Sequence, residues 1–310
     1  MRIRLTLVLL AASAATSHGQ ASNEDIFLVS LSRAGGKLTA SGARNLTNRP
    51  GYDNQPSWSR DGNTLYFTAR DDFQTDIYGI EPASGKLTRV TLTAPESEYS
   101  ATLMPSGDAV SVIRVERDST QRLWSVPLNG SAGVPIFDNI KPVGYHTWAN
   151  DSLLGLFVLG SPNTLQLGNT RTGRGDTIVT SIGRSLHTTA EGQVSFVHKV
   201  SNDEWWLTLL DPLTKQTRRL VRMPRRVEDY AWTPDGVVLA GEGTVLKSWN
   251  PERGGEWEVV GDLAPFGMTG ITRLSVSPRG DVVAVVASPS SPGLDPSRQA
   301  ISGSTRAQRP

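Results

Sequence analysis

A short turn motif recurs along most of this chain at a nearly constant interval, and this repetition constrains the fold more than any other feature. Each copy is a cluster of small or polar residues that ends on Gly or Ser and precedes an apolar run. The copies end at Gly62, Gly107, Ser152, Gly192, Gly236 and Gly280. The intervals are therefore 45, 45, 40, 44 and 44 residues. Repetition at this period indicates an array of similar structural units.

The residues around each turn have the composition of short β-strands. Apolar runs follow the turns, for example at 110–113, 194–197 and 282–286. A Pro, Asp or Gly turn between two such runs is typical of a β-hairpin. Two further short strands follow in most copies, as at 76–80 and 87–90. Four strands in about 44 residues are the signature of one blade of a β-propeller.

The two ends of the repeat array predict how the ring closes. The last copy contains only two strands, within residues 271–287, whereas segments 25–31 and 44–47 have the pattern of a missing outer pair. Shared strands of this kind close a propeller and remove exposed sheet edges. We therefore predict an all-β, six-bladed β-propeller over residues 24–287, with four-stranded blades and a last blade closed by the N-terminal strands within 24–47.

One repeat carries a family resemblance. The segment from Pro56 to Thr68, with Asp76-Ile77-Tyr78 and Leu87-Thr88 after it, resembles the WD40-like repeat of TolB-type propellers. The turns at 234–236 and 277–280 are similar to the same motif. The resemblance covers residues 24–287 and implies a six-bladed ring, while a propeller fold by itself indicates little about function.

The N-terminus has the pattern of a secretory signal peptide. Arg2 and Arg4 precede an apolar run at 5–15, and small residues follow it. The run is shorter than the roughly 20 residues that a membrane-spanning helix needs. We therefore predict a signal peptide over residues 1–20, with cleavage before Gln20 or Ser22, no membrane span after its removal, and a periplasmic or extracellular protein.

The C-terminal segment and the overall charge narrow the possible partners. Residues 288–310 are rich in Ser, Pro, Gly and Arg without apolar periodicity, which predicts a disordered tail. The chain has 31 Lys and Arg against 30 Asp and Glu, a formal net charge of +1. This balance gives no electrostatic reason to expect a nucleic-acid partner or an anionic membrane.

Several kinds of catalytic chemistry have no sequence support. The chain contains no Cys, which excludes thiol nucleophiles and Cys-bound metals, and it has no Gly-x-Ser-x-Gly elbow of a serine hydrolase. His146, His187 and His198 lie at different distances from their turns, so they do not share one ring position. We therefore predict no metal site, no cofactor and no catalytic residue.

Three tryptophans stand at one repeat position and are expected to pack between blades: Trp58, Trp148 and Trp232. Trp205 and Trp206 are adjacent in a predicted strand, so their side chains face opposite ways and one of them can lie at an outer rim.

The starts of the innermost strands are the best candidates for a binding site, because in a propeller they surround one mouth of the central channel. They are polar, charged or aromatic in every blade. The candidate residues for a ligand or partner are Asn54, Tyr99, Tyr145, His146, His187, Asp229, Tyr230 and Arg273. The sequence thus predicts an exported, non-enzymatic scaffold of the cell envelope that binds an envelope or secreted protein, a peptide or a small ligand. The alternative is an enzyme of the lyase or lactonase type, with its active site at the same mouth.

Overall fold

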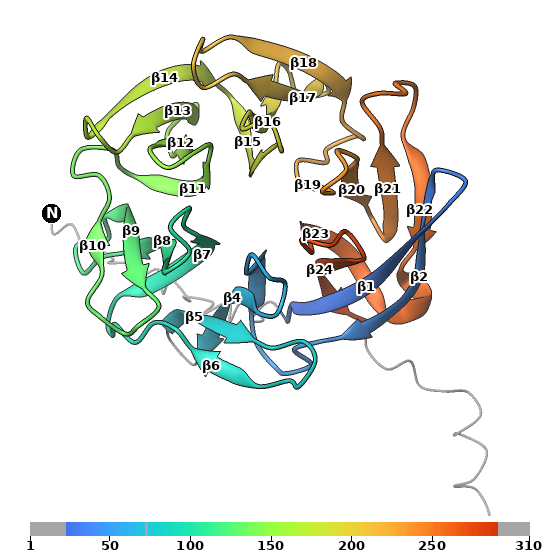
Figure 1. Cartoon of the computed structure of the whole chain (residues 1–310), viewed down its shortest axis with the longest axis horizontal. Coiled ribbons are helices and arrows are strands. Elements are labelled where there is room, and N and C mark those ends of the chain that lie inside the picture. The colour runs from blue at the N-terminus through green and yellow to red at the C-terminus, as the bar shows by residue number, and fades with distance from the viewer. Residues whose placement is uncertain (1–22, 72–73, 291–310) are drawn as a thin grey trace, which may run out of the picture.

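The structure is a computed structural model that describes residues 23–71 and 74–290. Six antiparallel sheets of four strands stand around a central axis as the blades of a propeller (Figure 1). Among the described residues the helical structure is one 3₁₀ turn, η1 (Ala264–Phe266). The predicted all-β, six-bladed architecture is confirmed. The predicted signal peptide and nearly all of the predicted tail lie outside the described residues.

The strands of each blade run from the channel outward in chain order, except in the blade that closes the ring. The innermost strands are β3 (Asp53–Trp58), β7 (Ser97–Leu103), β11 (Val143–Trp148), β15 (Ile182–Thr188), β19 (Tyr230–Trp232) and β23 (Met268–Val276). The second strands are β4 (Leu65–Asp71), β8 (Ala109–Val115), β12 (Leu153–Val158), β16 (Val194–Lys199), β20 (Val238–Glu242) and β24 (Val282–Pro289). The third strands are β5 (Gln74–Ile80), β9 (Gln121–Pro127), β13 (Thr164–Asn169), β17 (Trp205–Leu210), β21 (Val245–Trp249) and β1 (Asp25–Ala34). The outer strands are β6 (Leu87–Arg89), β10 (Val134–Pro135), β14 (Arg174–Thr180), β18 (Thr217–Arg222), β22 (Glu258–Asp262) and β2 (Lys37–Asn45). Blades one to five are β3–β6, β7–β10, β11–β14, β15–β18 and β19–β22, and blade six, which closes the ring, consists of β23, β24, β1 and β2.

The N-terminal strands close the ring as predicted. The last blade has the order β2-β1-β24-β23, and Phe27 of β1 pairs with Val285 of β24. Strand β24 extends beyond the expected boundary at residue 287, because Pro289 still pairs with Met268. The last blade is therefore built from both ends of the described chain.

The hydrophobic core lies between blades. In β24, Val283 and Val285 pack against blade five, whereas Ala284 and Val286 pack against blade one. Successive side chains of a strand point to opposite faces, and here a neighbouring blade covers each face. This explains why the second strands are continuous apolar runs.

The three repeat-equivalent tryptophans join neighbouring blades, as the sequence predicts. The indole N–H of Trp58 donates to the Ser275 carbonyl at 3.0 Å, that of Trp148 to Ser111 Oγ at 2.9 Å, and that of Trp232 to Ser195 Oγ at 2.8 Å. Each acceptor belongs to the preceding blade of the ring.

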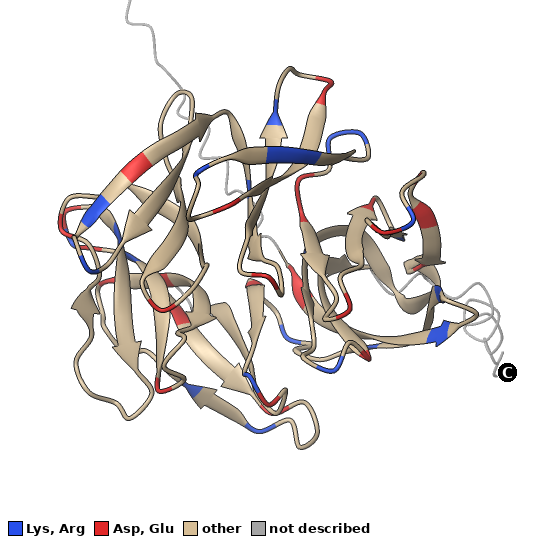
Figure 2. Ribbon diagram, turned by 45° about the horizontal axis from the view of Figure 1, so that its top comes forward, with Lys and Arg blue, Asp and Glu red and all other residues tan. Residues whose placement is uncertain are grey.

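Charged residues of both signs are interspersed over the strand ends and connecting loops (Figure 2). No helix of the described part of the chain is long and apolar enough to cross a membrane.

Candidate functional site

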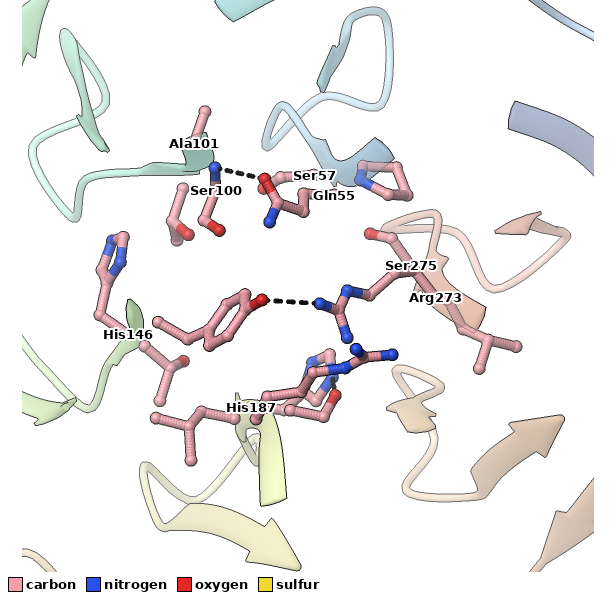
Figure 3. A pocket seen from close by; sticks show the side chains of 16 residues that line it. Gln55, Ser57, Ser100, Ala101, His146, His187, Arg273 and Ser275 are labelled. Carbon is pink, nitrogen blue, oxygen red and sulfur yellow. Dashed lines mark hydrogen bonds between the residues drawn. The ribbon is translucent and has the colours of Figure 1, made fainter. Parts of the chain in front are cut away.

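One repeat position lines the central channel with a different residue in each blade. It lies seven residues before the end of each turn. The six residues at this position are Gln55, Ser100, Tyr145, Ser185, Asp229 and Arg273. All except Asp229 line a channel cavity of about 170 Å³, to which five innermost strands contribute (Figure 3). The repeat therefore brings residues from the whole length of the chain into one small site.

Charged side chains occupy one half of the channel wall. Arg273 binds Asp229 through Nη1, and its Nη2 donates to the Tyr145 hydroxyl at 2.9 Å. The guanidinium carbon lies 5.0 Å from the centre of the Tyr145 ring. Arg184 donates to the other oxygen of Asp229 at 2.7 Å. Asp229 is thus shared by two cations, which leaves this half of the wall with an excess of positive charge.

A second carboxylate, Glu228, partly offsets the positive charge behind this cluster. Glu228 lies 3.6 Å from Arg184 and 2.7 Å from Lys199 Nζ. Burial disfavours the Arg184 cation, but the hydrogen bonds and charge of Asp229 outweigh burial, and the pKa of Arg184 is raised. Arg184 therefore stays charged under all physiological conditions.

The other half of the wall is neutral and is held in an unusual backbone conformation. Gln55 and Ser100 are non-glycine residues in the left-handed region, with φ of 56° and 54°. Both lie where the pairing register of the innermost strand shifts, which marks a β-bulge. Such a conformation costs of the order of 1–3 kcal/mol for a non-glycine residue and concentrates at functional sites.

The bulges fix the direction of the Gln55 amide. Its Oε1 accepts from the Ser100 backbone N–H at 2.9 Å and from Thr68 Oγ1 at 2.7 Å. The Ser100 N–H is a donor, so it must face the oxygen of the Gln55 amide and not its NH₂ group. This contact fixes the orientation of the amide. Its NH₂ group points into the opening that Arg273 also faces (Figure 3). Ser100 Oγ is buried and has no hydrogen-bond partner among the described residues.

His146 borders the channel cavity, and its buried ring lies in the joint between blades two and three. Ser111 Oγ donates to the Thr102 carbonyl, accepts from the Trp148 indole, and lies 2.6 Å from His146 Nε2. Which atom donates in the bond between Ser111 Oγ and His146 Nε2 depends on the tautomer of the imidazole ring. Burial lowers the pKa of His146 to about 3, consistent with a neutral ring.

Tyr230 occupies the same repeat position two blades further on and makes the same kind of bond. It is fully buried, and its hydroxyl donates to Ser195 Oγ at 2.9 Å. The structure therefore corrects the expectation that Tyr230 contacts a ligand, because it lies beneath the wall. Its ring supports His187 edge-on at 4.9 Å. Burial lowers the pKa of His187, which lines the channel, to about 4.

The remaining sequence candidates lie nearer the mouth. Asn54 is buried and donates to Glu24 Oε2 at 2.6 Å, so it positions the chain and is not free to bind a ligand. Tyr99 is partly buried against the core between blades two and three. Tyr52, which the sequence candidates did not include, has its pKa raised to about 12 by burial and then by Glu24.

The structure thus divides the eight sequence candidates. Tyr145, His146, His187 and Arg273 line the channel, Asp229 holds the two arginines in place, and Asn54, Tyr99 and Tyr230 support the wall. Sequence reasoning missed Gln55, Ser100 and Arg184 as wall residues. The repeat register contains the signal for the first two, because they share the position of Tyr145 and Arg273.

A wider cleft of about 1100 Å³ lies between blades four and five. Some of its polar groups are used within the protein: the Trp249 indole donates to the Gly255 carbonyl, and Asp235 binds Arg33 and Thr233. The channel is the better candidate, because the innermost strands of five blades meet there and it contains the buried Ser100 Oγ, which has no partner among the described residues.

The residues present do not form a metal site. Among the described residues, no three His, Asp or Glu side chains come together in a way that could hold a metal ion. His146 and His187 are separately bonded to Ser111 and Ser185.

Comparisons with known proteins agree on the fold. No protein-family model matches the sequence, and no curated protein is similar to it. A putative TolB from Agrobacterium tumefaciens superposes with a TM-score of 0.68 and 14% identity, over 86% of this chain and 98% of that one. TolB from Acinetobacter baumannii gives 0.56 and 11%, over 85% of this chain and 64% of that protein, so this chain spans less than two thirds of its length.

Enzymes are also found among similar propellers. A putative gluconolactonase superposes with a TM-score of 0.58 and 11% identity, over 84% of this chain and 95% of that one. The chain therefore has the six-bladed fold of TolB-type propellers, while function has to be argued from the site.

Proposed function

We propose that this protein is an exported binding module of the cell envelope, and that the mouth of its central channel recognises a partner or ligand. Tyr145 and Arg273 make the direct contacts, and Asp229, Tyr99 and Tyr230 hold the wall behind them.

The observation that carries this proposal is the set of polar groups without partners in a rigid channel. The NH₂ group of Gln55 faces the opening, and Ser100 Oγ has no partner among the described residues. Buried polar groups without hydrogen bonds are costly, so a site that keeps them gains when a ligand satisfies them. The blades already fix these groups, which reduces the entropy lost on binding.

Binding fits the channel better than catalysis. A lyase or lactonase would need an acid–base pair or a metal centre facing the substrate. The carboxylate nearest the channel wall, Asp229, is held by two arginines, and the two histidines have pKa values of about 3 and about 4. Groups tuned this far from neutral pH are poor general acids and bases.

The test compares capture by the wild-type protein and by a channel variant. Each is immobilised and exposed to envelope extract from the source organism, and the recovered proteins are re-tested as purified components. We expect Tyr145→Ala with Arg273→Ala to weaken binding by about 2 kcal/mol or more, the scale of an interface hot spot.

Arg171→Ala is the matched control, because Arg171 is an exposed residue in the turn between β13 and β14. Melting temperatures of all variants are measured in parallel. Equal capture by the channel variant and the control would contradict the proposal and direct attention to the rim around Trp205 and Trp206.

A further inference from the structure

We propose that the channel binds a carboxylate presented at the end of a slender group. This inference rests on the proposed function, since it names the ligand chemistry of the same site. Four groups from four blades carry it: Gln55, Ser100, Tyr145 and Arg273.

Four blades contribute hydrogen-bond donors to the cavity wall. The two amide hydrogens of Gln55 Nε2 face the opening, and Ser100 Oγ is buried without a partner among the described residues. Tyr145 accepts a hydrogen bond from Arg273, so its own hydroxyl proton stays available. Arg273 has five N–H groups, of which Asp229 and Tyr145 occupy two.

The charges on the wall select for an anion. The residues that line the cavity include Arg184 and Arg273 but no Asp or Glu. The carboxylate behind them, Asp229, already accepts from both guanidiniums. An ionised carboxylate has only acceptor oxygens and pairs favourably with a guanidinium, so it complements this wall, whereas a cation does not.

The size of the cavity limits what can carry the carboxylate. A volume of about 170 Å³ is smaller than the roughly 300 Å³ at which common small-molecule sites begin. The channel therefore admits a chain end or a single acidic substituent, while the rest of the ligand stays outside the cavity.

The strained backbone supports the same assignment. The left-handed conformations of Gln55 and Ser100 direct the Ser100 N–H onto Gln55 Oε1. This bond consumes the acceptor of the amide and leaves its donors facing the channel. In an ordinary strand conformation, this contact would not fix the orientation of the glutamine side-chain amide.

The experiment is an NMR titration of the labelled protein that follows the Gln55 side-chain amide and the Arg273 Nε–H. The probes are N-acetyl-trialanine with a free carboxylate, the same peptide with a C-terminal amide, and galacturonate. We expect saturable shifts with at least one of the two carboxylates and none with the amide. Saturation by the peptide acid alone identifies a chain end as the ligand, and saturation by galacturonate alone identifies a sugar acid.

Two variants test the residues. Arg273→Gln removes the charge and should weaken carboxylate binding at least tenfold. Gln55→Glu replaces the amide donors with a like charge and should abolish binding, and it does so without disturbing the Arg273–Asp229 pair if the first variant folds poorly. Arg171→Gln, at the exposed turn, should bind as the wild type does.

The inference is overturned if the amide binds as well as the acid, if neither carboxylate saturates the shifts, or if both channel variants bind normally. Its failure is distinguishable from that of the proposed function. Capture that depends on Tyr145 and Arg273 without carboxylate binding would leave the binding role standing, and carboxylate binding without such capture would remove only the scaffold role.

Discussion

Two histidines of the channel wall are kept neutral by burial. The pKa of His146 is about 3 and that of His187 about 4, against about 6.5 in an unfolded chain. The His146 ring lies in a blade joint and is hydrogen-bonded to Ser111, in the place where blade five uses Tyr230. A neutral ring suffices there, and a charged ring would be an unpaired buried cation.

The free energy of unfolding should therefore depend on pH through these residues. Between about pH 6.5 and pH 4 the unfolded chain takes up protons that the folded histidines refuse, so each one lowers stability by up to about 1.4 kcal/mol per pH unit as the pH falls. We expect His146→Gln and His187→Gln to flatten this dependence. Urea unfolding at pH 7, 6, 5 and 4.5 measures it.

The variants have to be compared with the wild type because two carboxyl groups change the stability with pH in the opposite direction to the histidines. Burial raises the pKa of Asp53 to about 6 and also raises that of Glu98, so these groups bind protons more readily in the folded state and favour folding as the pH falls. His198→Gln is the comparison, because burial and Arg219 also lower the pKa of His198 but this residue is only partly buried on β16, so its removal should flatten the dependence less. Parallel stability curves for all variants and the wild type would refute the assignment.

At the scale of the strands, two serines on second strands, Ser111 and Ser195, each join two neighbouring blades by hydrogen bonds. Ser195 accepts from the Tyr230 hydroxyl and the Trp232 indole, and it donates to the His187 carbonyl. Ser111 accepts from the Trp148 indole, donates to the Thr102 carbonyl and is hydrogen-bonded to His146 Nε2. The joints of blade two to three and of blade four to five are therefore built alike.

Removing one such serine should be costly for its size. Ser195→Ala leaves the buried Tyr230 hydroxyl and the partly buried Trp232 indole N–H without an acceptor. Each such group costs about 1–3 kcal/mol, so we expect a loss of about 2–6 kcal/mol in the free energy of unfolding. Urea denaturation measures it, with Ser131→Ala in the exposed loop after β9 as the control. A loss no larger than that of the control would show that the joint does not need the hydroxyl.

The sequence predicts the strands well because their signals are local. A turn between two apolar runs specifies a hairpin whatever the rest of the chain does, and six such turns specify the blades. It also brings Tyr145 and Arg273 to one mouth, and the structure joins their side chains by a hydrogen bond across 128 residues.

The channel wall is less predictable because bulges decide which way its residues face. Tyr230 and Asn54 are polar residues at the start of innermost strands, yet they turn into the protein. The left-handed conformations of Gln55 and Ser100 go with contacts between these two residues and with Thr68. The partners are distant in the sequence, so no local sequence pattern predicts these conformations.

At the scale of the whole molecule, the pairing of β1 with β24 holds the ring together. Ile26 and Val29 have no exposed surface, and Val283 and Val286 are equally buried in the partner strand. The closing blade therefore contributes core to both of its neighbours.

Removal of residues 24–47 should abolish cooperative folding, because it exposes an edge of β24 and uncovers the cores of blades five and one. Removal of 291–310 is the matched truncation and should hardly change the melting temperature. Calorimetry measures both. A truncated protein without 24–47 that still melts cooperatively as a monomer would show that the ring does not need its closing strands.

The pairing of β1 with β24 also determines when the ring can close during synthesis of the chain. Each of the other blades pairs strands that are made close together in time, whereas Ile26 must wait for Val286, which the ribosome adds 260 residues later. During that interval β1 and β2 can pair only with each other, and an interrupted chain keeps an open edge on β1 that is prone to proteolysis or aggregation. Resistance of the ring to proteases therefore indicates that β24 has been synthesised and has paired with β1.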